Sequence, residues 1–247
     1  MLYGICNLSI VPLRLEASDA SEMVSQILFG EEFKVLEREL KWSKIELSYD
    51  GYIGYIDNKQ YEEIDEETFN NLSNSKDYYT TEIIDFVTTK ENDLSTISIG
   101  SRLPFYHNNH FTIGTKDYFY DGNVSSEKLA KNEIIRKAFQ FLNTPYLWGG
   151  KTPFGIDCSG FTQLVYKLCG HALLRDARDQ ATQGEVLSFI EESEPGDLAF
   201  FDNEEGNIVH VGIIMNDYHI IHAHGKVRID TLDPVSYTHL RAHETRH

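Results

Sequence analysis

The sequence changes its pattern at Ser125, and this change limits the folds available to the chain. Before it, short runs with the alternation of β-strands recur between turn signals, as in residues 33–37, 43–47 and 53–56. After it, two helix-type patterns come first and strand-type runs follow them. Short strands in one half, and helices followed by strands in the other, predict an α+β protein with more than one domain.

The second half begins with an amphipathic pattern that predicts a helix from Ser126 to a point before Pro145. A second helix is expected from about Asp157 to Gly170. Strands should follow after Gly196, and their runs cover 197–201, 209–215 and 219–224. The predicted domain boundaries are 1–63 and 64–125 for two small β-barrels, 126–233 for the α+β domain, and 234–247 for an atypical tail.

That tail interrupts the domain pattern, because it shows no strand alternation and holds three of the ten histidines. We interpret it as non-native sequence. His239, His243 and His247 are spaced like one face of a helix, but we assign them no metal and no function.

Composition excludes several classes of function. With 22 Lys and Arg against 39 Asp and Glu, the formal charge is −17, which disfavours nucleic acids and anionic membranes as partners. No run of 18 apolar residues predicts a membrane span. The N-terminus lacks the basic start and cleavage site of a signal peptide, so we expect a cytoplasmic protein, with an exported one as the alternative. Three cysteines are too few for a disulfide scaffold.

Cys158 has the local context of a thiol nucleophile. It stands in GIDCSG, residues 155–160, where a helix is expected to begin. A helix N-terminus favours the thiolate, and its exposed N–H groups can stabilise an oxyanion. Gly155 and Gly160 permit a close backbone approach there. Cys169, near the predicted helix end, is interpreted as a core residue.

Two histidines lie in neighbouring strand-type runs. His210 is surrounded by apolar residues, which makes an unpartnered ring costly, and His222 follows in the next run. Adjacent strands can place the two rings side by side, one as base and the other as its orienting partner. Zinc bound by Cys158, His222 and His224 is the alternative, but neither a second cysteine pair nor a Glu-flanked histidine motif supports a metal.

Four motifs in order resemble those of the NlpC/p60 cysteine peptidases. They are TPYLWGG at 144–150, GIDCSG at 155–160, PGDLAFF at 195–201 and VHVGI at 209–213, followed by His222. The resemblance covers residues 126–233 and implies a papain-like α+β core. It also implies that Cys158 is the nucleophile, His210 the general base and His222 the third member of the triad. Tyr146 would lie near the oxyanion and substrate, and Trp148, Asp157 and Ser159 would line or brace the cleft.

The layout resembles one branch of the family, the γ-D-glutamyl-diamino-acid dipeptidyl-peptidases, in which two SH3-like barrels precede the peptidase. In that branch the Asp of an Arg-Asp pair binds the free amine of an N-terminal L-Ala, and Arg175-Asp176 stands at the matching place. The alternative is that this pair, and Arg178-Asp179, are solvated helix charges. The first barrel helps to close the cleft in that branch. The candidate wall residues are Tyr52, Tyr55 and Glu22.

The expected function is therefore hydrolysis of the γ-D-glutamyl–diamino acid bond of murein peptides with a free N-terminal L-Ala. Such a monomeric enzyme would need no cofactor and would recycle wall peptides. The alternatives are an exported endopeptidase acting on the sacculus, a non-catalytic wall-peptide binding protein, and an acyltransferase on the same fold.

Overall fold

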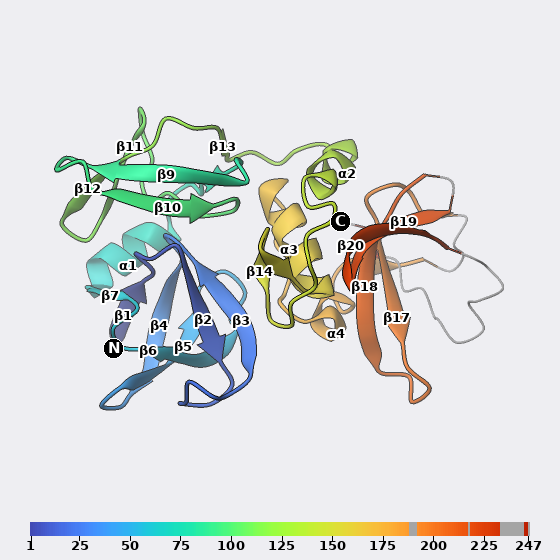
Figure 1. Cartoon of the computed structure of the whole chain (residues 1–247), viewed down its shortest axis with the longest axis horizontal. Coiled ribbons are helices and arrows are strands. Elements are labelled where there is room, and N and C mark those ends of the chain that lie inside the picture. Colours follow the sequence, from blue (N-terminus) through green and yellow to red (C-terminus); the bar gives the residue numbers. More distant parts are fainter. Residues whose placement is uncertain (188–191, 217, 233–244, 247) are drawn as a thin grey trace. The chain divides into compact units, whose positions relative to one another are not determined.

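A computed structural model of the chain describes residues 1–187, 192–216, 218–232 and 245–246 (Figure 1). The chain divides into two compact units, Met1–Ser126 and Glu127–His247. Most strands belong to the first unit, whereas the helices α2, α3 and α4 and a six-stranded sheet belong to the second. This is the α+β class that the sequence predicts.

The first unit begins with one seven-stranded antiparallel sheet in the order β3-β2-β6-β5-β4-β1-β7. Alternate side chains of its strands point inward because successive residues of a strand face opposite sides. In β5, for example, Ile45 and Leu47 are buried while Lys44 and Glu46 between and beside them are less so. The strands are β1 Leu2–Ile5, β2 Ile10–Arg14, β3 Met23–Leu28, β4 Glu32–Arg38, β5 Trp42–Leu47, β6 Ile53–Asp57 and β7 Glu62–Ile64.

The rest of the first unit packs onto this sheet through a shared core. Ile5 of β1 and Phe29, which follows β3, belong to the same buried cluster as Leu103 and Tyr120. A buried ion pair between Arg102 and Glu32 adds a polar contact. Residues 64–125 thus complete a unit with the first sheet. Their elements are α1 Glu66–Ser73, β8 Tyr79–Thr80, β9 Ile84–Thr89, β10 Leu94–Ser98, β11 His110–Ile113, β12 Lys116–Phe119 and β13 Val124–Ser125.

The second unit has one sheet, ordered β16-β21-β17-β18-β19-β20, with α3 and α4 packed on it and α2 packed on α3. Every residue of α3 is buried, and α3 packs on β18 and β19. The elements are α2 Asn132–Phe139, β14 Lys151–Thr152, β15 Gly155–Ile156, α3 Cys158–Leu168, α4 Ala177–Gln180, β16 Glu185–Val186, β17 Leu198–Asp202, β18 Ile208–Ile214, β19 His219–His224, β20 Lys226–Thr231 and β21 Thr245–Arg246.

The first predicted helix of this unit is wrong at both ends. Helix α2 begins only at Asn132 and ends at Phe139. The residues before it are held otherwise, because the Leu129 N–H donates to the carbonyl of Cys169 at 3.0 Å. An amphipathic pattern cannot distinguish a helix from a segment that is tied to another element in this way.

The end of the chain is described only in part. Of the tail interpreted as non-native, residues 234–244 and 247 lie outside the described residues, and with them His239, His243 and His247. Thr245–Arg246 forms strand β21, which pairs with β16 and β17. Within the described ranges, no helix is long and apolar enough to cross a membrane.

Candidate active site

Cys158 is the first residue of α3, and its position follows from the cap before it. Asp157 adopts an extended conformation and accepts a hydrogen bond from the Gly160 N–H at 2.7 Å, which is the contact of an N-cap residue. The thiol therefore lies at the positive end of the helix dipole. A Cβ on Gly160 would lie 2.3 Å from the carbonyl oxygen of Gly150, so only glycine lets the preceding loop approach the helix start so closely.

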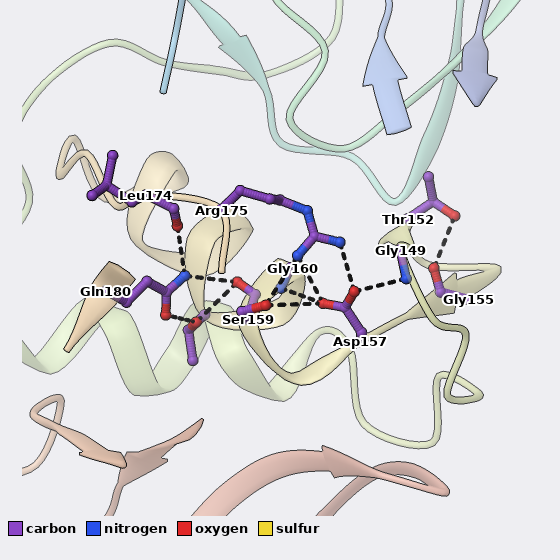
Figure 2. A network of polar contacts seen from close by, with 10 residues as sticks. Gly149, Thr152, Gly155, Asp157, Ser159, Gly160, Leu174, Arg175 and Gln180 are labelled. Carbon is purple, nitrogen blue, oxygen red and sulfur yellow. Dashed lines mark hydrogen bonds and ion pairs between the residues drawn. The ribbon is translucent and has the colours of Figure 1, made fainter. Parts of the chain in front are cut away.

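Arg175 contacts the residues at the start of this helix (Figure 2). Its guanidinium donates to both carboxylate oxygens of Asp157, at 3.0 and 2.6 Å, and to the Ser159 hydroxyl at 3.0 Å. The Gly149 N–H donates to the same carboxylate at 2.8 Å. Arg175 is only 2% exposed. The loop at Gly149, the start of α3 and Arg175 therefore meet at one charged pair beside the nucleophile.

Gln180 of α4 forms a second set of hydrogen bonds to the first turns of α3. Its amide donates to the carbonyls of Ser159 at 3.0 Å and Leu174 at 2.8 Å, and its oxygen accepts from Thr162 at 2.7 Å. Sequence reasoning missed Gln180, because a glutamine carries no signal of burial by itself. In the structure it ties α4 to α3 (Figure 2).

The two strand histidines lie side by side. Nε2 of His210, on β18, is 2.7 Å from Nδ1 of His222, on β19. Gly212 makes room for this arrangement, because a Cβ there would lie 2.9 Å from the His222 Cβ. The ring of Phe201 covers His210 at 5.5 Å between centroids. The structure thus brings together the pair that the sequence predicted as base and orienting partner.

A carboxylate that sequence reasoning missed follows His222. Asp230 Oδ2 lies 2.9 Å from His222 Nε2 and accepts from Arg228 Nε at 2.8 Å. Arg228 and Asp230 belong to β20, a strand that the sequence prediction did not include. Arg228 is the direct cross-strand partner of His222, and Asp230 is two residues further along the same face. The available signal was the alternation of charged and apolar residues from Lys226 to Asp230, which is typical of a strand.

The thiol lies against the strand that carries His210. Burial raises the pKa of Cys158 to about 11, and the Asp157 charge adds to the rise. Backbone hydrogen bonds from Val211 and Ser159 act in the opposite direction and offset only part of it. Burial and the charges of His222 and His224 lower the pKa of His210 to about 3. In the resting site both partners are therefore neutral near pH 7, and the proton moves as the thiol attacks.

The shifted His210 predicts acid-sensitive stability. The ring's unfolded pKa is about 6.5, above the folded value of about 3, so the unfolded state binds more protons between these values. Stability from His210 is present above the unfolded pKa and falls with pH below it. We expect a loss of roughly 1–2 kcal/mol in unfolding free energy between pH 7 and pH 5, measured by urea titration. His210→Gln should be less pH-sensitive by that amount, and equal sensitivity of both proteins would contradict the burial argument.

Of the other predicted site residues, three lie in the second unit and three in the first. Tyr146 forms a β-bridge with Ile156, two residues before the nucleophile, and burial and then the Cys158 charge raise the pKa of Tyr146 to about 12. Trp148 is 61% exposed on the loop before β14. Asp176 is the N-cap residue of α4 and follows the buried Arg175 directly. The remaining three candidates, Glu22, Tyr52 and Tyr55, belong to the first unit.

The alternatives for the cysteines and the metal can also be placed. Cys6, Cys158 and Cys169 are all free thiols, and Cys169 is fully buried next to the C-terminal end of α3. Among the residues that the structure describes, no cluster of three or more His, Cys, Asp or Glu side chains is placed to hold a metal ion. Cys158, His222 and His224 therefore form no such cluster.

A thiol at a helix start, beside a strand whose imidazole is hydrogen-bonded to a second imidazole, is the arrangement of a cysteine peptidase. The sequence profiles agree. The profile of the NlpC/P60 family matches residues 143–245, and that of the bacterial dipeptidyl-peptidase SH3 domain matches residues 13–60. The chain carries an NlpC/P60 cysteine-peptidase domain preceded by a bacterial dipeptidyl-peptidase SH3 domain.

Relatives of known name match different lengths of the chain. A gamma-D-glutamyl-L-lysine dipeptidyl-peptidase of Bacillus cereus is 28% identical over 235 residues, 85% of this chain and 70% of that protein. The protein of the same name from Bacillus subtilis is 41% identical over 102 residues, 40% of this chain and 34% of its own length. A probable endopeptidase p60 of Listeria seeligeri is 41% identical over 90 residues, 36% of this chain and 17% of that protein.

Among solved structures, an NlpC/P60 family protein from Bacillus cereus shares the fold over the whole chain. Its TM-score is 0.83 at 22% identity, with 99% of each chain covered. An NlpC/P60 endopeptidase from Photobacterium damselae has a TM-score of 0.71 at 16% identity, covering 98% of this chain and 65% of that one. The likeness extends to both units, not only to the catalytic domain.

Proposed function

We propose that the chain hydrolyses the γ-D-glutamyl–diamino acid bond of short murein peptides with a free N-terminal L-Ala, in the recycling of wall peptides. The observation that carries this proposal is the Cys158–His210–His222 arrangement in a chain that also has a dipeptidyl-peptidase SH3 domain. Two relatives named gamma-D-glutamyl-L-lysine dipeptidyl-peptidase support the choice of bond.

The chemistry follows from the positions of the groups. The Cys158 thiol gives its proton to His210 as the sulfur attacks the γ-carbonyl carbon of the D-Glu residue. Backbone N–H groups at the start of α3 are available to stabilise the oxyanion. His210 then gives the proton to the leaving amine of the diamino acid, and the C–N bond breaks. Water hydrolyses the thioester and releases the dipeptide and the free thiol.

The free-amine requirement rests on Asp176. The ion pair of Arg175 with Asp157, at 2.6 Å, fixes the backbone before Asp176 relative to the residue that precedes the nucleophile. A carboxylate held at this place can pair with the ammonium group of an N-terminal L-Ala, and a blocked N-terminus cannot form that pair. The same charge makes long, cross-linked wall chains poor substrates.

The test compares L-Ala-γ-D-Glu-L-Lys with its N-acetylated form. We expect kcat/KM for the free peptide to be higher by roughly 100-fold, the value of a charge-assisted pair of about 2–3 kcal/mol. Asp176→Asn should remove most of this preference, whereas Asp179→Asn, an exposed acid of the same helix, should leave it unchanged. Equal cleavage of the two peptides would overturn the free-amine requirement.

The exported endopeptidase is the second candidate, and the match to probable endopeptidase p60 proteins favours it for the catalytic domain. Purified sacculi added as a third substrate decide between the two. Release of peptides from sacculi at a rate comparable with the free tripeptide would support the endopeptidase and contradict the recycling role.

A further inference from the structure

The chain of ring contacts in the second unit ends on a carboxylate that the triad does not include. We propose that Asp230 is a positioning residue that fixes the proton arrangement of both histidines, so that His210 presents an unprotonated nitrogen to the Cys158 thiol. This inference rests on the proposed function only in taking Cys158 and His210 as the nucleophile and its base.

The argument starts at the carboxylate, because an ionised carboxylate only accepts hydrogen bonds. Asp230 is held ionised, since hydrogen bonds from His222 and Arg228 lower its pKa against the effect of burial. At 2.9 Å from Asp230 Oδ2, Nε2 of His222 must therefore carry the proton. A neutral imidazole has one N–H, so Nδ1 of His222 is an acceptor.

The next contact carries the same logic to the base. Nδ1 of His222 accepts at 2.7 Å from Nε2 of His210, so that nitrogen of His210 carries its proton. The remaining nitrogen, Nδ1 of His210, is then the one without a proton. The contact between the Val211 backbone and the Cys158 sulfur places the thiol beside this residue. One carboxylate thus sets two tautomers in sequence.

Without the carboxylate the reverse arrangement is equally compatible with the ring contact. His222 can donate from Nδ1 to Nε2 of His210, and His210 then carries its proton on Nδ1, the nitrogen that would otherwise take the thiol proton. That form cannot accept the thiol proton. The two rings alone are symmetric in this respect, and an acceptor at the far end removes the symmetry.

Arg228 holds the carboxylate in place. Its Nη2 lies 2.6 Å and its Nε 2.8 Å from the same Oδ2 that faces His222. Asp230 is itself 36% exposed, so without this clamp its side chain would exchange between water and His222. When His210 accepts the thiol proton, the new positive charge spreads toward His222 and is compensated by Asp230 without any further proton transfer.

The test uses alkylation of Cys158 by iodoacetamide, which needs the thiolate but no peptide. The Cys158-containing peptide is quantified by mass spectrometry, and Cys6 and Cys169 are both fully buried. From pH 6 to 8 His210 takes the thiol proton as the sulfur attacks the reagent, and we expect Asp230→Asn to slow alkylation about tenfold, equivalent to one unit of pKa. Near pH 10 hydroxide ionises the thiol directly, so the two rates should converge.

Asp179→Asn is the matched control, an exposed Asp paired with Arg178 at 3.3 Å in the same unit, and should behave as the unaltered chain. Asp230→Glu keeps the carboxylate and should recover at least about a third of the neutral-pH rate. If Asp230→Asn does not fold by circular dichroism, the Glu variant and Arg228→Gln carry the test, each with an intermediate rate near pH 7.

Two outcomes overturn the proposal: an unchanged rate at neutral pH in Asp230→Asn, or slowing by one constant factor at every pH, which a general structural defect would produce. Peptide cleavage is measured in parallel, where kcat should fall and KM should stay constant, because Asp230 acts through its hydrogen bond to His222. Failure of every peptide to be cleaved contradicts the proposed function, whereas the alkylation profile decides on Asp230 independently.

Discussion

Replacing Cys158 with alanine is expected to lower kcat for peptide cleavage by about 10⁴-fold or more, because no other group can form the covalent intermediate. Cys158 is the one thiol of the chain that lies beside His210, through the backbone of Val211. The measurement is release of the diamino acid from the tripeptide, followed by chromatography. A non-catalytic wall-peptide binder would instead bind the peptide equally with and without the thiol and would cleave it in neither case.

Cys169→Ala is the matched control for this substitution. Cys169 follows the last residue of the same helix, is fully buried, and has a pKa that burial likewise raises to about 11. Its removal should cost stability of about 1 kcal/mol and leave kcat within about twofold. Retained cleavage in Cys158→Ala would move the nucleophile elsewhere and contradict the mechanism.

Replacing Arg175 with methionine is expected to destabilise the second unit by about 3–5 kcal/mol, because it leaves the buried carboxylate of Asp157 without its counter-charge. Arg175 and Asp157 are 2% and 6% exposed and share two hydrogen bonds. The same change should lower kcat, since the Asp157 charge is no longer balanced and raises the pKa of Cys158 further. Urea unfolding and iodoacetamide alkylation measure the two effects.

Arg178→Met is the control, because Arg178 is 73% exposed at its side chain and its pair with Asp179 lies in water. We expect a change within about 0.5 kcal/mol there. The double variant Asp157→Asn with Arg175→Met should lose less unfolding free energy than the two single variants lose in sum. The difference should be about 0.5–3 kcal/mol, the interaction energy typical of two residues in contact. Strict additivity would show that the two side chains act separately.

Arg175 and Asp176 have separate roles in the structure. The sequence motif predicted that both residues bind substrate. In the structure Arg175 points toward Asp157 and Ser159 at the start of α3 (Figure 2). Asp176 is instead the N-cap residue of α4. Arg175 is buried and Asp176 is only half-buried, so a buried ion-pair partner and a candidate ligand for substrate can follow each other directly.

What the sequence determined by itself is local. The start of α3 at Cys158, capped by Asp157 and followed by Gly160, depends on contacts within four residues, and the alternation of β18 and β19 predicts their strands. Such contacts are encoded by residue type and spacing. The nucleophile and the two histidines could therefore be named in advance.

Only the tertiary structure decided which residues from distant parts of the chain contact each site residue. Asp157 meets Arg175 across 18 positions, and His222 meets Asp230 because the β19–β20 register places them diagonally. Neither follows from spacing, since a shift of one residue in register would turn every side chain of β20 to the other face. Cys158 is a nucleophile candidate by its sequence. The charge beside it and the proton on its base depend on strand register and on the packing of α3.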